Sequence, residues 1–142
     1  MVENNMTYQQ IALTGHVLGA LFYCEPDSPA CSDIVAQLSS GEWVAQWPYG
    51  LETQLMPIAA LLAQDKSDET LEEAWQRLFI GPYALPAPPW GSVYLDKENV
   101  LFGDSTLKLR DWMAQQPVDV TLEQQEPEDH FGLLLMMAAW LA

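Results

Sequence analysis

Residues 75–103 read WQRLFIGPYALPAPPWGSVYLDKENVLFG, and residues 126–132 read EPEDHFG. The first stretch opens with an apolar helical stripe and then carries four prolines between residues 82 and 89, which exclude a helix and favour extended backbone. The second places carboxylates and one of the two histidines at the expected start of an apolar helix. Neither stretch holds a nucleophile motif, a phosphate loop or a metal cluster. Together they indicate a peptide-gripping surface rather than a site of chemistry.

The composition predicts one domain, residues 1–142, with a substantial core, because 49% of the residues are hydrophobic. The chain is strongly acidic, with 20 Asp and Glu against 5 Lys and Arg, which gives a net charge of −15. Such a field repels nucleic acid and anionic lipid and attracts cationic partners. A second interpretation is that the charge only keeps a hydrophobic protein soluble.

The cysteines and the N-terminal residues indicate a cytoplasmic protein with reduced thiols. Cys24 and Cys31, the only cysteines, flank a proline-containing turn. A disulfide across that turn is an option, but two cysteines are too few for a disulfide scaffold. The N-terminus MVENNMTYQQ has no basic segment, so we expect no signal peptide. No uncharged apolar run approaches the length that spans a membrane.

Apolar spacing predicts a mainly helical chain. Ser67-Asp68 is the expected cap of the helix that carries Trp75, and Asp104-Ser105 of the following one. A loop is expected over residues 41–50, and residues 92–95 and 100–102 are expected to pair as a minor hairpin. The expected helices cover residues 8–23, 28–38, 55–62, 69–80, 104–113 and 127 onward.

The last of these helices is apolar on nearly every side. It is expected to begin at Pro127, a favourable first helical position, with Glu128 and Asp129 in its first turn. A helix that is hydrophobic all round must be buried on several faces. Nothing follows Ala142 to cover it. We therefore expect either a chain truncated at its C-terminus, which is the favoured interpretation, or a second copy that supplies the cover.

The aromatic and proline residues have two interpretations. The Pro-Trp segment could be a turn packed onto the core. Alternatively, Trp75, Leu78, Phe79 and Trp90 line a groove that the prolines hold open, which lowers the ordering cost of binding a peptide. The groove interpretation fails if Trp90 and His130 are sealed far apart inside the protein.

Asp129 and His130 have three interpretations. They are structural residues at a helix start, or metal ligands, or part of a recognition site in which Glu126, Glu128 and Asp129 bind guanidinium groups. A metal-dependent hydrolase centred on Asp129 and His130 is the alternative function. No nucleophile setting surrounds the serines or threonines, so we expect no enzymatic activity and no cofactor.

Five motifs resemble the TorD/DmsD family of redox-enzyme maturation chaperones, and within it the DmsD group most closely. They lie in order along nearly the whole chain and comprise residues 18–22 (LGALF), 75–79 (WQRLF), 88–92 (PPWGS), 101–107 (LFGDSTL) and 126–132 (EPEDHFG). The resemblance implies an all-α, single-domain helical bundle of the TorD-like type without catalytic activity. Family members continue through further helices beyond the position of Ala142, which agrees with the expected truncation.

The resemblance also implies a function and a site. Such chaperones bind the twin-arginine signal peptide of a molybdoenzyme precursor, in the DmsD group the catalytic subunit of dimethyl sulfoxide reductase, and hold back export until the cofactor is loaded. The translocase at the membrane is a further candidate partner. The protein is expected to be a monomer or a helix-swapped homodimer. The signal-binding positions fall on Trp75, Leu78, Phe79, Tyr83, Pro89, Trp90, Pro127, Asp129 and His130. Tyr83 departs from the Trp that DmsD-like sequences can carry there, and Cys24, next to Tyr23, stands where a second aromatic would be unsurprising.

Overall fold

The computed structural model describes residues 2–64, 66–117 and 126–142, and these residues form helices without strands or a sheet. The predicted all-α fold is therefore confirmed. No helix in the described ranges combines the length and apolar character needed to cross a membrane. The elements in chain order are α1 (Val2–Tyr23), α2 (Ser32–Ser40), η1 (Glu42–Ala45), α3 (Glu52–Leu62), α4 (Leu71–Trp75), η2 (Gln76–Ile80), α5 (Gly91–Leu95), α6 (Asp104–Ala114) and α7 (Phe131–Leu141).

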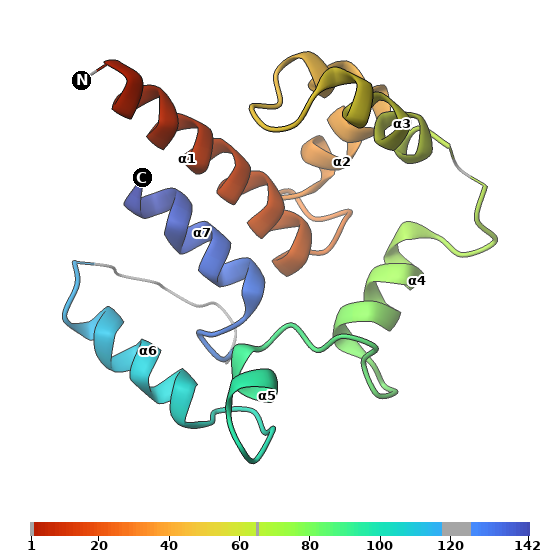
Figure 1. The fold of residues 1–142 in the computed structure, drawn as a ribbon. Coiled ribbons are helices and arrows are strands. Elements are labelled where there is room, and N and C mark those ends of the chain that lie inside the picture. Colours follow the sequence, from red (N-terminus) through yellow and green to blue (C-terminus); the bar gives the residue numbers. More distant parts are fainter. Residues whose placement is uncertain (1, 65, 118–125) are drawn as a thin grey trace.

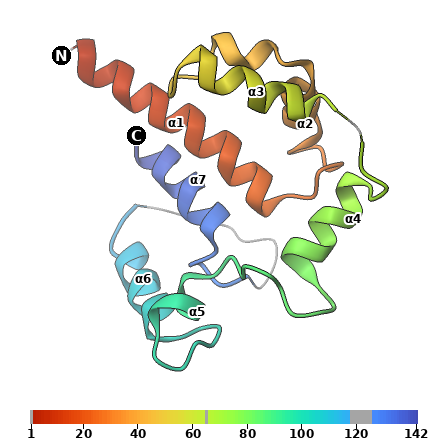
Figure 2. The same ribbon diagram turned by 45° about the vertical axis from the view of Figure 1, so that its right-hand side comes forward.

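The helices α1 and α7 lie side by side and run in opposite directions, so that the shorter α7 packs along the second half of α1 (Figures 1 and 2). Glycines permit their close approach. A Cβ atom added at Gly19 would lie 2.8 Å from the carbonyl oxygen of Gly132, and one added at Gly15 would lie 2.7 Å from that of Leu135. Since the helix backbones nearly touch, the start of α7 is fixed against the end of α1.

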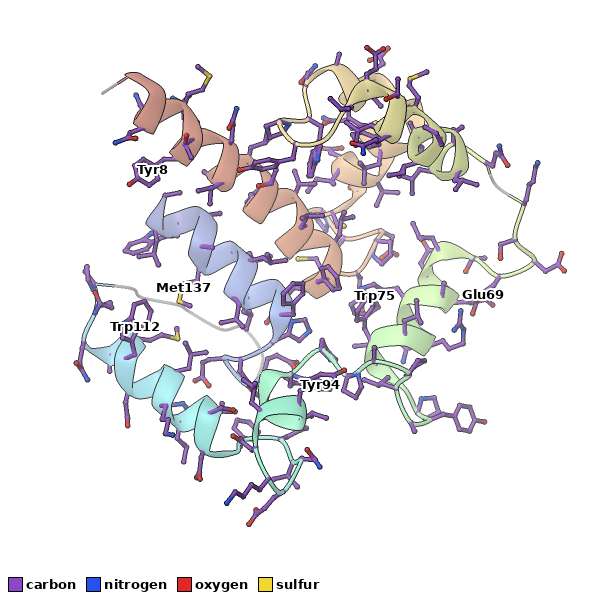
Figure 3. The ribbon with its side chains drawn as sticks, viewed as in Figure 1. Tyr8, Glu69, Trp75, Tyr94, Trp112 and Met137 are labelled. Carbon is purple, nitrogen blue, oxygen red and sulfur yellow. The ribbon has the colours of Figure 1, made fainter. Side chains whose placement is uncertain are left out.

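The remaining helices surround this pair (Figure 1). A small core of Val44, Leu55 and Ala59, with Trp43 and Trp47 packed against it, joins η1 to α3. On the other side, Met137 points from α7 toward α6 (Figure 3). The predicted burial of α7 is only partial, because Phe131, Trp140 and Leu141 remain about half exposed.

The helix that carries Trp75 begins later than predicted. Its cap is Thr70, not Ser67-Asp68: the Thr70 hydroxyl accepts from the Glu73 amide, and the Glu73 carboxylate accepts from the Thr70 amide at 2.8 Å. This reciprocal pair satisfies two otherwise unpaired donors, which favours Thr70 over the earlier candidates. The helix continues as the π-helix η2 and ends at Gly81, whose φ of 111° favours glycine.

The predicted hairpin is wrong, because residues 91–95 form the short helix α5. The carboxylate of Asp129 accepts from the Ser92 amide at 2.6 Å and so stabilises the first turn of that helix. Asp104-Ser105 does not cap α6 itself, since Gly103 is the cap residue and Asp104 the first helical residue. A preceding turn supplies the acceptor instead, because Asp96 accepts from the Ser105 amide at 3.1 Å.

The last helix begins at Phe131, four residues after the predicted start at Pro127. Its cap is His130, whose Nδ1 accepts from the Gly132 amide at 3.1 Å. Residues 127–130 instead form a turn in which the His130 amide donates to the Pro127 carbonyl. The favourable first-turn chemistry of Pro127 is overridden because this segment pairs with residues 89–91, a contact that its local sequence does not announce.

Candidate functional site

An isolated antiparallel β-bridge between Trp90 and His130 is the centre of the candidate site. The Gly91 amide donates to the Asp129 carbonyl at 3.1 Å, and the Phe131 amide donates to the Pro89 carbonyl at 2.7 Å. The prolines before Trp90 keep this segment extended and available for pairing. Trp90 and His130 therefore lie side by side, as the peptide-binding interpretation requires.

Asp129 is buried and holds neighbouring backbone in place. Only 4% of the residue is exposed, and its Oδ2 accepts from the Ser92 amide, while its Oδ1 has no partner among the described residues. The side chain is therefore engaged in starting α5 and is not free in solvent. Its role in the site is to hold the backbone of Ser92 in place.

His130 is buried and forms one wall of the site. Its ring makes edge contacts with Tyr23, at 5.3 Å between centroids, and with Trp90, at 5.9 Å. Burial lowers the pKa of His130 from 6.5 to about 4, although the neighbouring carboxylate of Asp129 opposes the shift. The ring is therefore neutral at pH 7, which agrees with its Nδ1 accepting from the Gly132 amide.

A groove of about 600 Å³ opens between the end of α1, the α4–η2 segment and the bridge. Trp75 projects into it from α4 (Figure 3). We call it the acidic groove because its described lining holds two carboxylates and no Lys or Arg. Its lining residues are Tyr23, Cys24, Glu25, Ser28, Pro29, Ala30, Trp75, Phe79, Ile80, Trp90, Glu126 and His130.

A second cavity of about 300 Å³ lies on the other side of Phe79 and Trp90, which line both. We call it the apolar pocket, since Asp129 is the only charged residue in its described lining. Phe22 bridges its walls through edge contacts with Phe79 at 5.8 Å and Phe131 at 5.0 Å. The lining residues are Phe22, Phe79, Ala87, Pro88, Pro89, Trp90, Gly91, Tyr94, Asp129, Phe131 and Leu134.

The structure brings most of the predicted site residues together. Trp75, Phe79, Trp90 and His130 line the acidic groove, whereas Pro89 and Asp129 line the apolar pocket. Pro127 is buried in the turn that precedes His130.

Two predicted residues lie apart from both cavities. Tyr83, 85% exposed, lines a separate hollow of about 710 Å³ beside Glu72 and Arg77. Leu78, on η2, lies at the surface outside the lining of either cavity.

The carboxylates predicted to bind guanidinium have different roles in the structure. Glu128 is paired with Arg110 at 2.8 Å, and this hydrogen-bonded cation lowers the pKa of the carboxyl. Glu126 faces the acidic groove and accepts a hydrogen bond from the Trp90 indole. Sequence reasoning missed Glu25, the second carboxylate of the groove. The only available signal was its position just after the 18–22 motif and Tyr23.

The geometry gives the metal-hydrolase alternative no support. Asp129 and His130 are neighbours along the chain but line different cavities. Each uses one side-chain atom to accept from a backbone amide. In the described part of the chain, no three His, Cys, Asp or Glu side chains come together as a metal site would require.

Comparison with known proteins gives a consistent set of relatives. A family model described as the nitrate reductase delta subunit matches residues 45–142. The Tat proofreading chaperone DmsD of Salmonella typhi is 57% identical over 92% of this chain and 63% of its own length. The probable Tat proofreading chaperone DmsD of Haemophilus influenzae is 43% identical over 96% of this chain and 67% of its own length. The chaperone protein YcdY of Escherichia coli is 26% identical over 93% and 64%. The chain thus spans less than two thirds of the Salmonella relative, and these relatives are named as chaperones, not as enzymes.

Proposed function

The chain belongs to the nitrate reductase delta subunit family, which includes the TorD-like chaperones, and from this membership we propose that it binds the twin-arginine signal peptide of a molybdoenzyme precursor. The precursor is of the dimethyl sulfoxide reductase catalytic-subunit type. Binding in the cytoplasm delays export until the cofactor is loaded. The membrane translocase is a candidate second partner. The proposal combines the chaperone function for which the relatives are named with the chemistry of the site.

The acidic groove is the observation that carries the proposal. A twin-arginine signal presents two guanidinium groups followed by an uncharged apolar segment. The groove combines carboxylates with aromatic walls, and both kinds of group bind guanidinium, through paired hydrogen bonds and through stacking. Its aromatic side chains are also of the type that anchors peptides.

Within this proposal the predicted residues have separate tasks. Trp75, Phe79, Trp90 and His130 contact the peptide directly from the walls of the groove. Pro89, Pro127 and Asp129 position those walls through the bridge and its turn. Leu78 and Tyr83 would contact only parts of the ligand that extend over the outer face of η2.

Calorimetry with a synthetic leader peptide tests the proposal. Trp90→Ala removes a wall of the groove and the partner of Glu126, so we expect the dissociation constant to rise about tenfold or more. Trp140→Ala is the matched control, because Trp140 is exposed on α7 away from the groove. If both variants bind with the affinity of the parent, or if the parent ignores the leader, the proposal is wrong.

A further inference from the structure

We propose, resting on the proposed function, that the leader crosses the wall made by Phe79 and Trp90 in one direction: its paired guanidinium groups occupy the acidic groove beside Glu25 and Glu126, and its apolar segment occupies the apolar pocket beside Tyr94. Glu25 and Tyr94 thereby become specificity residues.

The bridge itself separates the two compartments. His130 is the extended residue between the turn over residues 127–130 and the start of α7. It lines the acidic groove, whereas its chain neighbours Asp129 and Phe131 line the apolar pocket. Because Phe79 and Trp90 form a wall common to both cavities, a peptide that passes over these two side chains enters the second cavity directly after leaving the first.

The charges of the groove fit a cation. Glu25 is exposed and has no cationic partner among the described residues. Glu126 uses Oε1 for the Trp90 indole, which leaves Oε2 for a ligand. Neither arginine of the described chain competes, since Arg77 is paired with Glu69 and Arg110 with Glu128.

The end of α1 adds to this preference. The helix is 22 residues long, it ends at Tyr23, and its last turn holds no basic residue. The partial negative charge at its C-terminus is therefore not compensated within that turn, and it lies next to Tyr23, Cys24 and Glu25 of the groove lining. A cation is favoured here by the backbone as well as by the two carboxylates.

The apolar pocket fits the opposite end of the leader. Tyr94 is 61% exposed and Phe131 is 46% exposed, so both offer uncovered apolar surface. The pocket's charged residue, Asp129, is itself buried and has one oxygen occupied by the Ser92 amide. Binding of an uncharged segment would cover this surface without burying an unpaired charge of the ligand.

A double-mutant cycle by calorimetry tests the charge assignment. The probes are synthetic leaders with an Arg-Arg pair or a Gln-Gln pair before the same Leu/Ala-rich segment. Glu25→Gln should weaken binding of the Arg-Arg peptide about two- to fivefold, the range expected for an exposed ion pair, and leave the Gln-Gln peptide unchanged. Asp27→Asn is the matched control, because Asp27 lies in the same turn, is exposed and lies outside the groove lining.

The apolar assignment is tested in the same way. Tyr94→Ser should weaken binding of the Arg-Arg leader about tenfold. The substitution should have no effect on binding of a leader in which a Ser/Gly-rich segment replaces the Leu/Ala-rich one. Tyr49→Ser, at another exposed tyrosine, is the control. Equal losses with both peptides, or losses equal to those of the controls, would overturn the assignment.

Direction is tested by photo-crosslinking and mass spectrometry. A benzophenone beside the Arg-Arg pair should label residues 23–30, and one at the far end of the apolar segment should label residues 91–95 or 131–134. The reverse pattern overturns this inference while leaving the proposed function intact. Failure of the unmodified protein to bind the Arg-Arg leader overturns both.

Discussion

Gly19 offers a test in which two physical effects have opposite signs. Replacing a glycine inside a helix by alanine ordinarily stabilises the protein by about 1 kcal/mol, because alanine is the better helix former. In α1, however, the added Cβ would lie 2.8 Å from the carbonyl oxygen of Gly132 and 2.7 Å from Cγ of Met136. The methionine side chain can move, but the carbonyl belongs to the backbone of α7 and cannot move without displacing the helix.

The steric contact therefore decides whether Gly19→Ala stabilises or destabilises the protein. Overpacking of this kind costs about 1–3 kcal/mol and more where backbone must shift, which exceeds the gain in helix propensity. We expect Gly19→Ala to lower the free energy of unfolding by about 1–2 kcal/mol. Because Tyr23 at the end of α1 contacts His130 at the start of α7, the same displacement should also weaken leader binding.

Urea unfolding followed by circular dichroism measures the effect. His16→Ala is the matched control, since His16 is exposed on the same helix and its replacement raises helix propensity without a new contact. A Gly19→Ala variant that gains stability as His16→Ala does would show that α1 and α7 are not in backbone contact. The account of how the site is held together would then be wrong.

Three further predictions concern the site. The pKa of His130 is about 4 in the folded protein against a reference value of 6.5, so on acidification the unfolded state binds the proton first. The free energy of unfolding, measured by urea titration, should therefore fall by about 2 kcal/mol between about pH 7 and about pH 5. The variant His130→Asn, which can still cap α7, should not show this loss. Asp129→Ala leaves the Ser92 amide without its acceptor and should cost about 1–3 kcal/mol in thermal unfolding, whereas an unchanged melting temperature would contradict the assigned contact. Bound leader should slow alkylation of Cys24 in the groove, measured by mass spectrometry, while the buried Cys31 stays unreactive with or without leader.

Helices with regular apolar spacing and clear terminating residues could be predicted from the sequence. The helix over residues 8–23 is present in α1, and Gly81-Pro82 ends η2 as expected. Both signals are local: the apolar residues recur at helical spacing, and a Gly-Pro pair ends a helix, which agrees with the φ of 111° at Gly81. Such features need no knowledge of the rest of the chain.

The elements that build the site could not be predicted in this way. The helix α5 depends on Asp129, a residue 37 positions away from Ser92 along the chain. The strand preference of Val93 and Tyr94 favoured a hairpin, but one buried carboxylate at the helix start outweighs it. The role of Glu25 likewise depends on the approach of α4 and the bridge to the end of α1, which no local pattern reveals.

The wrong start for α7 is the most informative of these differences. By local chemistry Pro127, Glu128 and Asp129 make a good first turn. The chain instead closes a separate turn over residues 127–130, His130 is extended with a φ of −58° and a ψ of 129°, and α7 begins only at Phe131. In a helix, neighbouring side chains are about 100° apart, so Asp129 and His130 would share one flank of α7. In the structure the two residues line different cavities instead, and this lets Asp129 start α5 while His130 forms a wall of the acidic groove. Local preference and tertiary pairing disagree here because the site requires the pairing, and a segment of this kind is where sequence-level rules are expected to fail.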